Sequence, residues 1–147
     1  MKDKLPPTSQ EKGQSLIEFA VSLVILLLLL AVAVDAGRAF FTFMSLRDAV
    51  QEGALWGSYN PTETDLIEDR VTKASNLVQA IANDPDAVLN IDVDIIGTEA
   101  CNGSGLRVQA TYENFPITMP FLGMFIGSQE VPISASVTDT ILVPPCE

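Results

Sequence analysis

The sequence predicts an α+β protein, in which a long N-terminal transmembrane helix extends into a small domain with a second helix packed on a three- to four-stranded antiparallel sheet. Three observations lead to this prediction. An apolar run lies near the N-terminus, a stretch with helical periodicity follows it, and three stretches with strand periodicity occupy the second half of the chain. The 147 residues suffice for one membrane segment and one compact domain of about 100 residues.

The apolar run is long enough to cross a bilayer. Residues 19–34 contain neither a charge nor a proline, and the wider stretch 16–36 carries charges only near its ends, at Glu18 and Asp35. At about 1.5 Å per residue, a helix over 16–36 spans about 31 Å, close to the hydrocarbon thickness of a membrane. The alternative is a helix buried in a protein core, but a small domain has little room to surround a helix that is apolar on every face.

The charges on either side of the run predict its orientation. Lysines precede it and the chain after it is acidic, so the positive-inside rule places the N-terminus in the cytoplasm and the domain outside the cytoplasmic (inner) membrane. A cleaved signal peptide is the alternative, because Ala31-Val32-Ala33 loosely fits the cleavage pattern of small residues. However, the helical pattern of apolar residues runs on to Trp56, so cleavage after Ala33 would divide one continuous helix.

A short pattern before the run indicates proteolytic processing. Gly13 follows a basic leader, and Glu18 lies five positions after it. Glycine lets a chain extend into a protease cleft without obstruction by a side chain. Cleavage between Gly13 and Gln14 would create an amine that shares a helix face with the Glu18 carboxylate, so the two groups could pair within a subunit or between neighbouring subunits. The alternative is an acid at the level of the lipid headgroups.

Three stretches of the helix carry a family resemblance. They are Glu18-Phe19-Ala20 at the start of the run, Asp35-Ala36-Gly37-Arg38 at its end, and Ala49-Val50-Gln51-Glu52-Gly53-Ala54 beyond it. In this order they resemble the TadE-like family of pilin-related proteins from tight-adherence (Tad, Flp) systems, which share an EFA-type start, an acid-x-Gly-Arg exit and an A-x-x-E-G-A helix. The strong part of the resemblance covers Gly13 to about Tyr59.

The resemblance implies a type IV pilin-like fold, cleavage by prepilin peptidase between Gly13 and Gln14, and a role in assembly for Glu18 and Phe19. The implied function is that of a minor pilin or pseudopilin of a Tad (Flp, type IVc) pilus, which contributes to assembly, adhesion or secretion. The expected partners are the peptidase, other pilin or pseudopilin subunits, Tad inner-membrane assembly proteins and the membrane, and an assembled subunit would be extracellular. The chain then has three parts: a prepilin-type leader over 1–13, a transmembrane and assembly helix over 14–36, and an extracytoplasmic domain over 37–147.

Two other functions remain open. An uncleaved, single-pass accessory protein of the Tad machine would need no acid at the position of Glu18. A membrane-anchored surface binding module would need exposed aromatic residues, for which Phe115, Phe121 and Phe125 are the candidates.

The first helix is predicted to continue outside the membrane to about Tyr59, where Asn60-Pro61 ends it. Asp35 and Arg38 are three positions apart and are expected to pair at the membrane exit. A stripe of small residues follows, and it suits contact with either the protein's own domain or another helix in a filament. The stripe consists of Ala49, Gly53 and Gly57.

A second helix and three strands are predicted in the rest of the chain. Asn60 or Thr64 is expected to cap the helix, which would bury one apolar face. This face comprises Ile67, Val71, Ala74, Val78 and Ile81. Alternation of apolar and polar residues predicts strands over 89–95, 106–113 and 131–138, and Pro132 indicates that the third is an edge strand. The apolar connection over 115–126 is expected to cover the core, with the membrane surface or a neighbouring subunit as alternatives.

Composition argues against several kinds of function. The net charge is −11 and no basic cluster lies beyond the first dozen residues, so nucleic acid is not an expected partner. The chain has no histidine, no metal-ligand motif and no phosphate-binding loop, so we expect no enzyme activity, catalytic residue, metal or cofactor. Cys101 and Cys146 are the only cysteines, and in a domain outside the membrane they are expected to form a disulfide, with two free thiols as the alternative.

Overall fold

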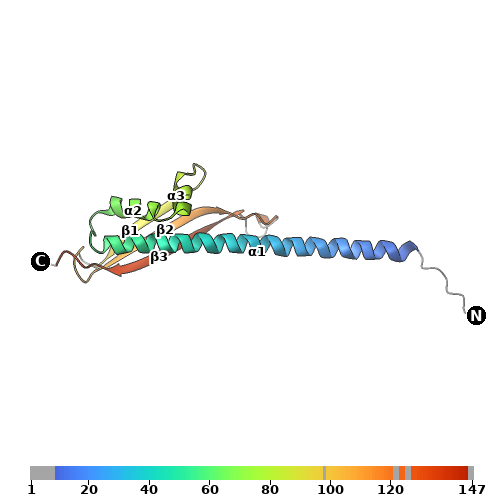
Figure 1. Ribbon diagram of the computed structural model, residues 1–147, viewed down its shortest axis with the longest axis horizontal. Helices are drawn as coiled ribbons and strands as arrows, with labels where there is room; N and C mark the ends of the chain where they lie inside the picture. The colour runs from blue at the N-terminus through green and yellow to red at the C-terminus, as the bar shows by residue number, and fades with distance from the viewer. Residues whose placement is uncertain (1–8, 98, 121–122, 125–126, 146–147) are drawn as a thin grey trace, which may run out of the picture.

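The computed structural model describes residues 9–97, 99–120, 123–124 and 127–145, with the backbone alone for 9–12. Helix α1 forms a rod whose C-terminal half carries all the other elements, while its N-terminal half projects from the domain (Figure 1). The predicted fold class is confirmed. The elements follow one another as α1 (Ser9–Gly57), α2 (Thr64–Lys73), α3 (Asn76–Asn83), β1 (Leu89–Ile96), β2 (Gly105–Pro116) and β3 (Glu130–Thr140).

Helix α1 is one continuous helix of 49 residues. At about 1.5 Å per residue it is about 74 Å long. Its sequence has no proline, so no backbone hydrogen bond is lost along its length, and the helix runs uninterrupted through Ala33. It ends at Gly57, slightly before the predicted end at Tyr59. There the amide of Tyr59 donates to the carbonyl of Trp56 at 3.2 Å and closes a turn.

The predicted second helix is divided into two, α2 and α3. The division falls at Ser75, whose side chain caps α3 by accepting a hydrogen bond from the amide of Val78 at 3.1 Å. Because the helix breaks here, Ala74 is exposed and leaves the predicted apolar face. The rest of that face is buried as predicted: Ile67, Val71, Val78 and Ile81.

The start of α2 also differs from the prediction. Neither Asn60 nor Thr64 caps this helix, because Glu63 occupies the N-cap position and makes no side-chain capping hydrogen bond. The side-chain amide of Asn60 instead donates to the carbonyl of Trp56 at 3.3 Å. Asn60 therefore closes the end of α1 rather than opening α2.

The three strands form one antiparallel sheet in the order β1-β2-β3. All three predicted strands are confirmed, and each is somewhat longer than predicted. The turn between β1 and β2 contains Gly103 at φ +97°, a conformation that favours glycine. Pro132 lies in β3, which is an edge strand as predicted, and an edge tolerates a residue without a backbone N–H.

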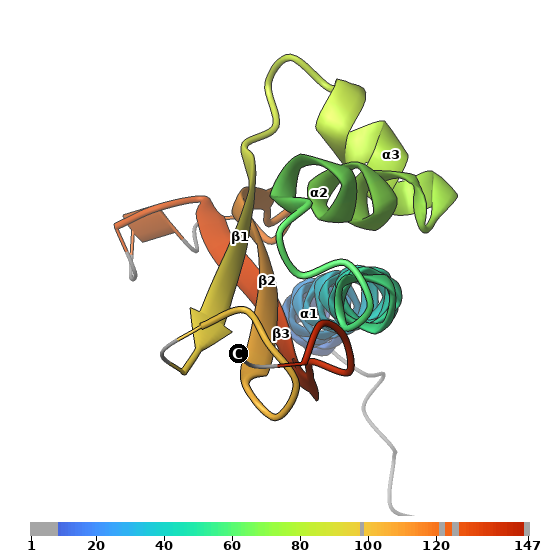
Figure 2. The same ribbon diagram turned by 90° about the vertical axis from the view of Figure 1, so that its left-hand side faces the viewer.

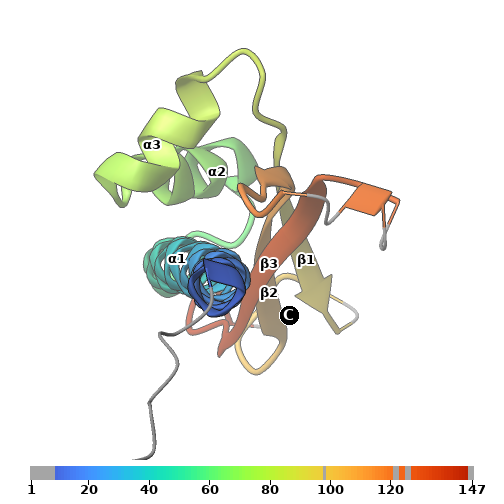
Figure 3. The same cartoon turned by 90° about the vertical axis from the view of Figure 1, so that its right-hand side faces the viewer.

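Helix α1 lies against one face of the sheet, beside β2 and β3, and α2 and α3 lie next to α1 on the side of β1 (Figures 2 and 3). The strands alternate accordingly. In β2, for example, Val108 is buried toward the helices while Arg107 and Gln109 lie on the opposite, polar face. The core consists of Leu46, Ala49, Val50, Ala54, Ile67, Val71, Val78, Leu106, Val108, Ala110, Ala135 and Ile141.

The stripe of small residues on α1 faces the protein's own domain. A Cβ atom added to Gly53 would collide with the side chain of Val71 in α2, and one added to Gly57 would collide with Leu106 in β2. Ala49 is fully buried. Close packing within the chain therefore accounts for the stripe, and the alternative of packing in a filament is not needed to explain it.

The predicted disulfide involves one residue inside the described part of the chain and one outside it. Cys101 lies between β1 and β2, is 7% exposed, and is not a free thiol. Cys146 lies outside the described residues. The pairing of Cys101 with Cys146 therefore stays a prediction.

Candidate functional site

The projecting half of α1 is an apolar helix that the domain leaves uncovered. In the part of the chain that the structure describes, α1 is the one helix long and apolar enough to cross a membrane. None of its most apolar stretch is buried within the protein, whereas the core helix of a soluble domain would be covered. Leu26, near the middle of this stretch, is 60% exposed. The helix therefore fits a single-pass membrane protein.

The predicted processing site lies within the first turns of α1. Gly13 is helical, and a Cβ atom added to it would meet open space, so no close contact within the described chain requires glycine here. Glycine lowers helix stability by about 1 kcal/mol relative to alanine, which makes this the weakest point near the start of the helix. Gln14, on the other side of the predicted cleavage point, is exposed.

The predicted assembly residues lie on the exposed surface of the same helix. Glu18 is exposed and is one helical turn from Gln14, so both side chains lie on one face. Glu18 makes no hydrogen bond or ion pair with any residue that the structure describes. Phe19 is 67% exposed beside it. The structure thus brings Gln14 and Glu18 together, away from the domain, and leaves the carboxylate available to a partner outside the chain.

At the end of the apolar run, Asp35 joins α1 to the domain. Asp35 is 7% exposed. Its carboxylate accepts hydrogen bonds from the backbone amide and hydroxyl of Thr118, at 3.1 and 2.5 Å, and from the amide of Met119 at 2.7 Å. It also pairs with Arg38 at 3.3 Å, which confirms the predicted ion pair. The contacts with Thr118 and Met119 were not predicted, because no local pattern points to residues 83 and 84 positions away.

Arg38 continues this contact into the aromatic core of the domain. Its guanidinium lies 5.2 Å from the centre of the Phe115 ring, an arrangement that favours the cation electrostatically. Phe115 is buried and packs edge-to-face on Tyr112, with the ring centres 6.0 Å apart. Burial raises the pKa of the Tyr112 phenol, and the nearby carboxylates of Asp84 and Glu130 raise it further. At the end of the apolar run, Asp35 and Arg38 therefore attach α1 to residues at the end of β2 and just beyond it.

Comparison with known proteins finds a family match within this helix. Residues 13–55 match the model of the family described as TadE-like protein. The chain is similar to TadE-like proteins over this segment. No curated protein and no solved structure matches the chain. The TadE-like match points to a protein associated with a Tad pilus system, and it spans the predicted processing site, Glu18 and Asp35.

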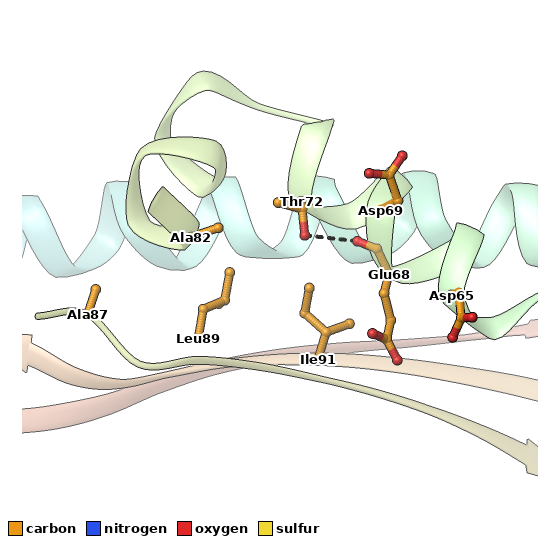
Figure 4. A pocket seen from close by; sticks show the side chains of 8 residues that line it. All are labelled: Asp65, Glu68, Asp69, Thr72, Ala82, Ala87, Leu89 and Ile91. Atoms are coloured by element: carbon orange, nitrogen blue, oxygen red, sulfur yellow. Dashed lines mark hydrogen bonds between the residues drawn. The ribbon is translucent and has the colours of Figure 1, made fainter. Parts of the chain in front are cut away.

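An acidic pocket lies outside the segment that matches the TadE-like family. It has a volume of about 410 Å³ and lies between α2, α3 and β1. Figure 4 shows that its carboxylates do not converge, since Asp69 points away from Asp65 and Glu68. Among the described residues, no group of three or more histidine, cysteine, aspartate or glutamate side chains is placed to hold a metal ion. The pocket is therefore an acidic surface whose carboxylates point in different directions.

Proposed function

We propose that this protein is a minor pilin or pseudopilin subunit of a Tad pilus, with a structural rather than an enzymatic role. The observation that carries the proposal is the Glu18 carboxylate, which is exposed on an uncovered apolar helix and has no partner in the described chain. An ionised side chain at the centre of a membrane helix costs about 2.5–3.5 kcal/mol, and less near the interface. An unpaired charge retained at this position implies a function for it.

A processed N-terminus would supply the missing partner. Cleavage by prepilin peptidase between Gly13 and Gln14 leaves a cationic amine at Gln14, one turn from Glu18. Within one subunit, this amine neutralises the carboxylate in the bilayer. In a filament, the amine of the next subunit takes its place, with Phe19 as an adjacent apolar contact, so that one charge sets the register of neighbouring subunits.

This function fixes an orientation and a set of partners. The leader lies on the cytoplasmic side of the inner membrane, where lysines precede the apolar run, and the acidic domain lies outside. In this proposal, the helix is bound first by prepilin peptidase and then by the inner-membrane assembly proteins of the Tad machine. In the filament it contacts other pilin or pseudopilin subunits. Adhesion and secretion are the processes to which such a subunit would contribute.

One observation favours a second candidate, an uncleaved accessory protein of the Tad machine. Helix α1 begins at Ser9, upstream of the predicted cleavage point, and continues through Gly13 without a break. A peptidase would have to unwind this first part of the helix to reach the bond after Gly13. An accessory protein that keeps its leader needs no such opening.

The N-terminal mass of the membrane-extracted protein distinguishes the two candidates. In cells with an active prepilin peptidase, the subunit proposal expects a chain that begins at Gln14. Gly13→Leu, which introduces a bulky side chain at the cleavage point, should keep the leader attached, whereas Gly37→Leu, at a half-buried position of the same helix where an added Cβ meets open space, should be cleaved normally. A wild-type chain that retains Met1 in such cells would contradict the subunit proposal and support the accessory protein.

A further inference from the structure

The connection between β2 and β3 has the composition of a membrane-contacting segment. No charged residue occurs from Pro116 to Gln129, although the chain as a whole contains 8 basic and 19 acidic residues. The end of the connection is marked by Glu130, the first residue of β3. An uncharged, apolar surface segment is a candidate for contact with a membrane or with another protein.

This connection lies beside the last turns of the apolar run. Figures 1 and 3 show its described parts at the end of the domain nearest the projecting half of α1, extending sideways from the helix. An apolar hollow of about 270 Å³ separates it from α1. The hollow is lined by Ile117 and Met119 of the connection and by Val32 and Ala36 of the helix, among others. Val32 belongs to the uncharged stretch 19–34, so the connection lies at the depth where that stretch ends.

Several backbone groups among the described residues of the connection are hydrogen-bonded within the protein. Asp35 accepts hydrogen bonds from the amides of Thr118 and Met119. The side-chain amide of Gln129 donates to the carbonyls of Ile117 and Met119, at 3.2 Å each. Two side chains thus hold backbone groups that water would otherwise hydrate. Such internal pairing is what a backbone segment needs where water is scarce, as at a membrane boundary.

Further hydrogen bonds complete this arrangement. The side-chain oxygen of Gln129 accepts from the amide of Gly123 at 2.5 Å, and its backbone carbonyl accepts from the amide of Ile117 at 2.9 Å. The amide of Gly127 donates to the carbonyl of Gly123 at 2.9 Å. Gln129 therefore organises the connection without adding a charge to it.

The connection also presents an apolar side chain that the protein does not cover. Met124 is 82% exposed, the largest exposure among the exposed large apolar side chains of the described residues. Burial of such a side chain in an apolar environment is favourable. On the next turns of α1, Phe40 and Phe41 are 59% and 70% exposed. Uncovered apolar groups therefore surround the membrane exit on both elements.

We propose that the described part of the β2–β3 connection, residues 117–120, 123–124 and 127–129, is a second membrane contact, which rests in the outer interface of the bilayer beside α1. The proposal rests on the membrane-spanning role of α1 in the proposed function. Lipid is the occupant favoured by the position of the connection next to Val32, by its lack of charge, and by the internal hydrogen bonds of several of its backbone groups. Because Asp35 clamps the connection to α1, this contact fixes the height and orientation of the domain on the membrane.

Tryptophan reporters in the full-length chain test this contact. In a Trp56→Phe background, Met124→Trp reports on the connection, Leu26→Trp on the membrane run, and Leu142→Trp on an exposed apolar site near the C-terminal end of α1. The protein is reconstituted into phosphatidylcholine vesicles whose acyl chains carry bromine at a shallow or a deep position. We expect Met124→Trp to show blue-shifted emission and quenching by shallow bromine, Leu26→Trp quenching by deep bromine, and Leu142→Trp quenching by aqueous acrylamide alone.

The remaining outcomes overturn the proposal in distinguishable ways. Quenching at position 26 by lipid, with position 124 quenched only by acrylamide, overturns the second contact and leaves the membrane span intact. Position 124 could instead be shielded both from brominated lipid and from acrylamide. If this shielding disappears when the protein is diluted in lipid, the occupant is a second copy of the chain, and the proposed membrane contact is overturned. Absence of lipid quenching at position 26 overturns the span itself, and the contact with it.

Discussion

The two halves of α1 belong to one continuous helix but have different surroundings. In the projecting half, large apolar residues are exposed on every side, as at Leu26 and Leu29. In the other half, one face is buried against the domain, with Leu46 and Val50 fully covered, while Arg47 lies exposed between them. A helix surrounded by lipid can carry apolar side chains on every face, whereas a helix on the surface of a domain in water buries only one apolar stripe. The same secondary structure therefore carries two patterns, and each pattern reports its environment.

Glycines and acids show the same division between the halves. A Cβ atom added to Gly13 would meet open space, whereas one added to Gly53 would collide with the side chain of Val71 in α2. Glu18 has no hydrogen-bond or ion-pair partner among the described residues. Asp35, in contrast, accepts three hydrogen bonds from Thr118 and Met119 and forms an ion pair with Arg38. In the domain-bound half, these residues are explained by contacts within the chain. In the projecting half, their explanation lies in partners outside it.

The largest expected difference between the halves concerns leucine. Leu46→Ala should lower the free energy of unfolding of the domain by about 2–5 kcal/mol, because Leu46 is fully buried and its loss leaves a cavity. Leu26→Ala, which is the same chemical change in the projecting half, should alter it by less than about 0.5 kcal/mol. Denaturant unfolding of the detergent-solubilised chain, followed by Trp56 fluorescence, measures both. Equal losses from the two variants would mean that detergent-solubilised α1 folds back onto the domain.

Removal of the Asp35 carboxylate should have the next largest effect. Asp35→Ala should destabilise the domain by about 1–3 kcal/mol, because the amides of Thr118 and Met119 lose their acceptor. Asp48→Ala is the matched control, since Asp48 is exposed on the same helix, and its effect should stay within about 0.5 kcal/mol. Hydrogen exchange should locate the change, with faster exchange of the two amides in Asp35→Ala only. Unchanged exchange at these amides would show that Asp35 does not hold the connection.

A smaller pair of effects, opposite in sign, is expected at two glycines of α1. Gly53→Ala should destabilise the domain by about 1 kcal/mol, because the new Cβ collides with the branched side chain of Val71 and this strain exceeds the gain in helix propensity. Gly37→Ala should instead leave the domain unchanged or stabilise it by up to about 1 kcal/mol, because its Cβ meets open space. Thermal unfolding of the two variants against wild type provides the comparison. Stabilisation by Gly53→Ala would indicate that the contact between α1 and α2 is looser than described.

Much of this fold follows from periodicity alone. The strands were predictable because each alternates apolar and polar residues over most of its length, and the end of α1 because Pro61 cannot continue a helix. The break between α2 and α3 was not predictable in this way, since the apolar spacing runs through Ser75 without interruption. There the capping hydrogen bond of Ser75 and the packing of each short helix outweigh the continuity of the pattern.

The site was predictable where its signals are local and not where they depend on packing. Gly13, Glu18 and the Asp35–Arg38 pair all follow from spacings of a few residues along one helix. The link between Asp35 and Thr118 joins distant parts of the chain and exists only once the sheet has packed on α1. The sequence also left open whether the stripe of small residues packs on the protein's own domain or on a neighbouring helix, because both contacts require small residues.

The smallest effect on stability is expected from the residue proposed to matter most in assembly. Glu18→Gln keeps the shape of the side chain and removes its charge, and Glu18 touches nothing in the described domain, so the free energy of unfolding should change by less than about 0.5 kcal/mol. Processing should also be unaffected, and the N-terminal mass should still correspond to a chain that begins at Gln14. Incorporation into the sheared pilus fraction should nevertheless be lost, because the carboxylate no longer pairs with the amine of the neighbouring subunit. Glu52→Gln, the same change in the domain-bound half, removes only an exposed ion pair with Arg70 at 3.8 Å and should assemble normally. Normal incorporation of Glu18→Gln would mean that the projecting half of α1 assembles through its apolar surface alone, and that the charge at its start has another purpose.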